Sequence, residues 1–83
     1  MRNVYVSLPT VEVVQKFVER VSMLEGAFDL LSCGYILDAR SLMGILSLDI
    51  AKPLLLAVEK DTAEAMRAIG PFITEAAAIS PAN

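Results

Sequence analysis

The stretch RSLMGILSLDIAK, residues 40–52, carries the most specific pattern in this 83-residue chain. Ser41 has a hydroxyl that can accept a hydrogen bond from the free N–H groups of a first helical turn, and apolar residues follow it at helical spacing. The pattern predicts a short helix that Ser41 caps and that ends before Pro53. Because neighbouring side chains on a helix diverge by about 100°, we expect either Leu42 or Met43 to stay near the surface.

Upstream of this stretch, the sequence predicts a strand followed by a helix. Residues 3–8 alternate in polarity, as in a strand with one face covered. Thr10 is placed to cap a helix that ends at Gly26. Apolar positions recur in this helix at intervals of three and four residues: Val14, Phe17, Val18, Val21 and Leu24.

Three further strands are expected. Residues 27–32 and 35–39 are largely apolar and flank Cys33-Gly34, which predicts a hairpin with Gly34 supplying the positive φ of a tight turn. Residues 54–60 begin with a continuous apolar run and form the last of these strands.

A third helix closes the predicted set of elements. Asp61 and Glu64 have the spacing of a capping box, so we expect Asp61 to cap it. Pro71 follows Gly70, which predicts a break at Gly70 and one further turn after it. The buried stripe of this helix is expected to contain Ala65, Met66, Ile69 and Ile73.

The element order β-α-β-β-α-β-α, with one apolar stripe on each helix, predicts an α+β fold. We expect a two-layer open-faced sandwich, in which three helices cover one face of a four-stranded, largely antiparallel sheet. One domain is expected over residues 1–75, followed by a frayed tail over residues 76–83.

Composition excludes several classes of protein. A hydrophobic fraction of 55% against 20% charged residues argues against disorder. A net charge of −3, with the basic residues spread along the chain, argues against nucleic-acid binding. No apolar run approaches the ~18 residues that a membrane span needs, and the start does not have the pattern of a secretory signal. The sequence therefore predicts a cytoplasmic protein without a membrane partner.

The set of reactive side chains is small. The chain has no His and a single cysteine, Cys33, so we expect neither a metal site, nor a cofactor, nor an internal disulfide. Without His the chain lacks the commonest general base at neutral pH, and it has no paired catalytic constellation. We therefore expect a protein that is not an enzyme.

Two features of the chain, the element order and the run SLMGILSL at residues 41–48 with its continuation through residues 50–52, point to a known family. In these features the chain resembles HPr, the histidine-containing phosphocarrier family of the sugar phosphotransferase system. The resemblance covers nearly the whole chain. Phe17-Val18, the Gly34 hairpin and the Asp61 cap fall at matching spacings. The resemblance implies an open-faced sandwich and a bacterial source.

The same resemblance implies roles for several side chains. Ser41 stands at the position of a regulatory serine that a dedicated HPr kinase phosphorylates. Leu42 and Met43, together with Leu46, correspond to an apolar patch that contacts partner proteins. Two simpler explanations stay open: Ser41 serves as an N-cap alone, or the apolar side chains belong to the core.

The chain departs from the family at the phosphohistidine site. HPr has Gly-Leu-His-Ala-Arg-Pro at the start of its first helix, where the His accepts phosphate and the Arg steadies it. Here Thr10 stands at the His position and Glu12 at the Arg position, and the preceding loop is shorter. A carboxylate repels a phosphoryl group, so the sequence predicts a divergent member that is not a phosphocarrier. Thr10 itself is better explained as a cap than as a phosphoacceptor.

Two functions follow as expectations. The first is a regulatory or protein-binding module whose partner is an HPr kinase or a transcription regulator, as in relatives that have lost the His. The second is a structural homodimer that covers the open face of its sheet and has no role in the phosphotransferase system.

Overall fold

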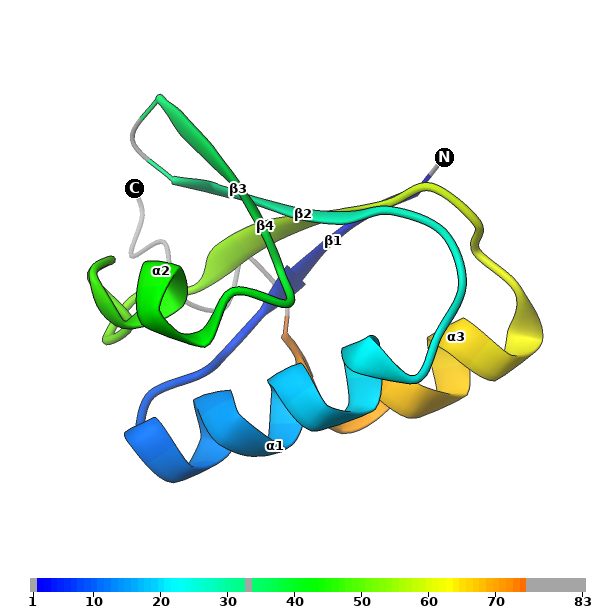
Figure 1. Cartoon of the computed structure of the whole chain (residues 1–83), viewed down its shortest axis with the longest axis horizontal. Helices are drawn as coiled ribbons and strands as arrows, with labels where there is room; N and C mark the ends of the chain where they lie inside the picture. Colours follow the sequence, from blue (N-terminus) through cyan, green and yellow to red (C-terminus); the bar gives the residue numbers. More distant parts are fainter. Residues whose placement is uncertain (1, 33, 75–83) are drawn as a thin grey trace.

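In the computed structural model, residues 2–32 and 34–74 are described, and they form an antiparallel sheet with helices on one face (Figure 1). The elements, in chain order, are β1 (Arg2–Val6), α1 (Val11–Ser22), β2 (Phe28–Ser32), β3 (Tyr35–Asp38), α2 (Leu42–Leu46), β4 (Leu54–Val58), α3 (Ala63–Ile69), the 3-10 turn η1 (Gly70–Phe72) and β5 (Ile73–Thr74). The strands lie in the order β3-β2-β4-β1-β5, and every pairing is antiparallel. The expected α+β sandwich is therefore present.

The core lies between the sheet and the helices. Along β4, Leu54, Leu56 and Val58 are buried towards the helices, while the residues between them are half-buried on the other face. The helix α1 packs against both α2 and α3. The rings of Phe17 and Phe72 meet edge to face, with centroids 5.3 Å apart. The predicted stripe of α1 accordingly lies in or against this core.

Within residues 2–32 and 34–74 the sheet has five strands, one more than the four expected. Pro71 lies in the first positions of η1 and prevents α3 from continuing, so the chain turns back towards β1. The N–H of Ser7 donates to the carbonyl of Phe72 at 2.8 Å, and β5 then pairs with β1. Ile73 was expected on the buried stripe of the third helix. It lies instead in β5, where its side chain is exposed.

Side-chain caps begin the three α-helices in the described part of the chain. Thr10 and Ser41 cap α1 and α2 as the sequence predicts. The predicted cap at Asp61 is wrong by one residue, because Thr62 has the extended backbone of an N-cap and its Oγ1 accepts from the N–H of Ala65 at 3.1 Å. The predicted break at Gly70 is confirmed by η1.

Two glycines lie at turns with positive φ. Gly34, with φ of 85°, lies in the β2–β3 hairpin as expected. Gly26, with φ of 91°, does not end α1, which stops at Ser22 with Met23 as its C-cap. Gly26 instead turns the following loop towards β2.

Strand boundaries differ from the predicted ones by at most two residues. Leu8 was expected in the first strand; β1 ends at Val6, but the Leu8 side chain is still buried in the core. The predictions for Cys33 and for the tail at residues 76–83 lie outside the described residues.

Candidate functional site

The start of α2 is anchored by Arg40. Its Nη2 donates to the carbonyls of Leu24 and Gly26, each at 2.8 Å, and its guanidinium lies over the ring of Phe28. Its Nη1 also lies 3.9 Å from Asp38 Oδ1. These contacts join the beginning of α2 to the loop that follows α1, so the residues after Arg40 have a fixed position in the fold.

Ser41 is exposed at the N-terminus of α2. Its Oγ accepts from the N–H of Gly44 at 3.3 Å, and its carbonyl accepts from the N–H of Ile45 at 3.0 Å. A Cβ on Gly44 would lie 2.8 Å from Ser41 Oγ, so glycine leaves room for the capping hydroxyl. The side chain predicted as a phosphorylation site is accessible and acts as a cap.

Three apolar side chains follow the cap, and we call Leu42, Met43 and Leu46 the α2 patch. Met43 is 76% exposed, whereas Leu42 and Leu46 are half-buried against the core. The intervening Ile45 is buried. Helix geometry therefore divides the two neighbours as predicted: Leu42 helps hold the helix in place, and Met43 projects into solvent.

Thr10 and Glu12 lie at the start of α1, the helix that packs against α2 (Figure 1). Thr10 Oγ1 accepts from the N–H of Val13 at 3.2 Å, and both Thr10 and Glu12 are exposed. Capping accounts for the threonine. The ionisable side chain in this first turn is a carboxylate, which is unsuited to holding a phosphoryl group.

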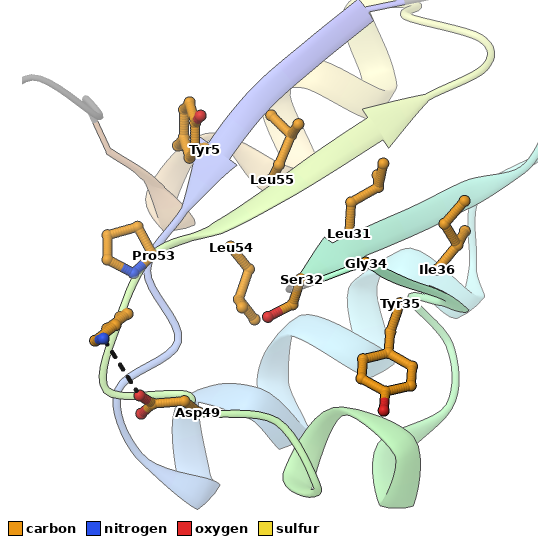
Figure 2. Close-up of a pocket in the computed structure, with 11 residues that line it drawn as sticks. Tyr5, Leu31, Ser32, Gly34, Tyr35, Ile36, Asp49, Pro53, Leu54 and Leu55 are labelled. Carbon is orange, nitrogen blue, oxygen red and sulfur yellow. Dashed lines mark ion pairs between the residues drawn. The ribbon is translucent and has the colours of Figure 1, made fainter.

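A row of apolar side chains crosses the face of the sheet that the helices leave open. Ile36 pairs with Leu31, Leu31 with Leu55, and Leu55 with Tyr5, so four adjacent strands each contribute one residue. Figure 2 shows these four side chains on the same side of the sheet. We call them the open-face row. Sequence reasoning missed the row because strand alternation gives the face of each residue but not the register between strands.

A hollow of about 510 Å³ lies along the open-face row, and all four residues of the row line it (Figure 2). Tyr5, Leu31, Pro53, Leu54 and Leu55 provide much of its apolar lining. The ion pair of Lys52 Nζ and Asp49 Oδ2, 3.9 Å apart, lies at its margin. Tyr35 points to the opposite side of the sheet, towards α2. This hollow suits apolar contacts better than acid–base chemistry.

Across residues 2–32 and 34–74, groups of three or more His, Cys, Asp or Glu side chains that could hold a metal ion are absent. Among these residues there is also no helix of sufficient length and apolar character to span a membrane. Comparison of the chain with protein-family models, curated proteins and solved structures finds no match.

Proposed function

We propose that this protein is an HPr-like regulatory module that binds other proteins through the α2 patch and is phosphorylated on Ser41 rather than on a histidine. The observation that carries the proposal is that Ser41 is exposed at the start of α2, two residues from the exposed Met43. A modification of the serine would therefore alter the surface that a partner contacts.

The local structure supports addition of a phosphoryl group without unfolding. Ser41 Oγ lies at the N-terminal end of α2, where N–H groups of the first turn have no partner within the helix. A phosphate there can accept hydrogen bonds from these groups, and it brings negative charge to the positive end of the helix. The neighbouring Arg40 is held by the carbonyls of Leu24 and Gly26, contacts that do not involve Ser41.

The proposal also includes the loss of phosphocarrier function. Thr10 replaces the histidine that accepts phosphate in the family, and its hydroxyl is used as a helix cap. Glu12 replaces the arginine. A phosphate ester of a hydroxyl group transfers its phosphoryl group far less readily than a phosphohistidine does. The negative charge of the Glu12 carboxylate would also repel an incoming phosphoryl group. The protein therefore has a regulatory role and is not an enzyme.

Incubation of the purified protein with an HPr kinase and ATP, followed by intact mass measurement, tests the proposal. We expect a gain of one phosphoryl group in the natural protein and no gain in Ser41→Ala. Ser47→Ala is a matched control, because Ser47 is also exposed and lies at the other end of α2. The absence of a gain in the natural protein, or an equal gain in Ser41→Ala, would contradict the proposal.

A further inference from the structure

The strand β3 forms one edge of the sheet and has an exposed surface. It pairs with β2 on one side only, and the described residues place no strand on its other side. Tyr35 and Ile36 are each 69% exposed. An edge of this kind offers free N–H and C=O groups to a further strand.

The hydrogen-bond phase of β3 identifies which groups are free. The N–H of Ala39 donates to the carbonyl of Phe28 at 2.8 Å. Backbone groups alternate in direction along a strand, so Leu37 and Tyr35, at two and four residues from Ala39, also direct their N–H and C=O groups towards β2. Ile36 and Asp38 therefore direct their N–H and C=O groups towards the open edge. The carbonyl of Asp38 already accepts from the N–H of Ser41 at 2.9 Å. Among the described residues, Ile36 retains both groups for an added strand.

We infer that β3 pairs with β3 of a second copy of this chain, antiparallel and centred on Ile36. At that centre the two Ile36 residues exchange both backbone hydrogen bonds, so the contact is self-complementary about a two-fold axis. The open-face row then continues from one copy into the other through the pair of isoleucines, and burial of these exposed side chains favours association.

Charge disfavours a register centred on Asp38. A pairing centred on Asp38 would place two carboxylates directly opposite each other, which destabilises a sheet. Centring on Ile36 places each Asp38 opposite Gly34, and the two carboxylates then lie about 14 Å apart along the strands, beyond the screening length at physiological salt.

The helix side of the edge has room for the second strand. A hollow of about 350 Å³ there is lined by Tyr35, Ile36, Leu37, Ser47 and Leu48. In the proposed register Tyr35 of one copy lies opposite Leu37 of the other, and both residues line this hollow. The exposed tyrosine ring would therefore be covered in the dimer. This self-association is independent of phosphorylation at Ser41.

Sedimentation equilibrium of the full chain at increasing concentration tests the pairing. We expect a reversible approach to twice the 9.0 kDa mass of one chain. Ile36→Lys should remain monomeric, because it places two like charges opposite each other at an exposed position that does not need repacking. Tyr5→Lys, on the same face but distant from β3 in the strand order, should dimerise as the natural chain does. A monomer at every concentration up to about 1 mM, or a dimer that survives Ile36→Lys, would overturn the inference.

Disulfide trapping tests the register separately. In a Cys33→Ser background, Ile36→Cys should form a covalent dimer on oxidation, because directly paired residues have Cα atoms about 5.5 Å apart, within the range of a disulfide. Asp38→Cys should not, because its counterpart lies about 14 Å away. Trapping through position 38 but not through position 36 would contradict the proposed centre.

Discussion

The guanidinium carbon of Arg40 lies 5.3 Å from the centre of the Phe28 ring, while Nη2 of the same side chain donates to two carbonyls of the loop after α1. One half-buried side chain thereby joins the loop after α1, the strand β2 and the start of α2. Hydrogen bonds from a charged donor and a cation–π contact both contribute to this junction.

Replacement of Arg40 should therefore cost substantial stability. We expect Arg40→Ala to lower the free energy of unfolding by roughly 2–3 kcal/mol, and Arg40→Lys by about half as much, because an ammonium group cannot reproduce the planar guanidinium contacts. Urea unfolding followed by circular dichroism measures both. A loss below about 0.5 kcal/mol in Arg40→Ala would show that these contacts are unimportant.

The cap of α3 can be assigned by a pair of neighbouring substitutions. Thr62→Ala should destabilise the protein by about 1 kcal/mol, because the N–H of Ala65 loses its acceptor. Asp61→Ala should change stability by less than about 0.5 kcal/mol, because its side chain does not cap the helix. Equal losses in the two variants, or a greater loss in Asp61→Ala, would contradict the assignment.

Ser41 and Gly44 should show energetic coupling. An added Cβ at position 44 would lie 2.8 Å from Ser41 Oγ and displace the capping hydroxyl. We expect Gly44→Ala to bring little net change in the natural chain, because lost capping offsets improved helix propensity, but to stabilise Ser41→Ala by roughly 0.5–1 kcal/mol. A double-mutant cycle by thermal or urea unfolding measures the difference. Additive effects would indicate that the hydroxyl is not displaced.

Met43 and Met23 provide a matched test of the α2 patch. Both are strongly exposed, at 76% and 84%, but Met23 is the C-cap of α1 and lies outside the patch. Met43→Ser should raise the KM of an HPr kinase for the protein several-fold, and Met23→Ser should leave it unchanged. Both substitutions should alter stability by less than about 0.5 kcal/mol. Equal kinetic effects would remove the α2 patch from the proposed docking surface.

The sequence predicts the order of the elements as far as α3, and two of the three caps, because these depend on local chemistry. Periodicity and side-chain oxygens at Thr10 and Ser41 act within one helical turn. The strand β5 could not be predicted from local periodicity, because Ile73 and Thr74 form a strand only by pairing with β1, which is distant in the sequence. At the start of α3, Asp61 and Thr62 are both suitable caps, and the backbone conformation decides between them.

In the candidate site, too, features set by local sequence could be predicted, and features that depend on contacts between distant segments could not. The exposure of Met43 beside Leu42 follows from helix geometry and could be predicted. The contacts of Arg40 could not, because its acceptors belong to a loop 14 and 16 residues earlier in the chain. The open-face row depends on the register of three strand pairings, which no single strand specifies.

We propose that this chain has a regulatory serine at Ser41 and lacks a phosphocarrier site at Thr10 and Glu12. Peptide-level mass spectrometry after treatment with an HPr kinase and ATP tests the regulatory serine most directly, because it assigns the phosphoryl group to a residue. We expect it on Ser41, with Thr10 and Ser47 unmodified. A phosphoryl group on Thr10 or Ser47 in place of Ser41, or on no residue, would contradict the claim.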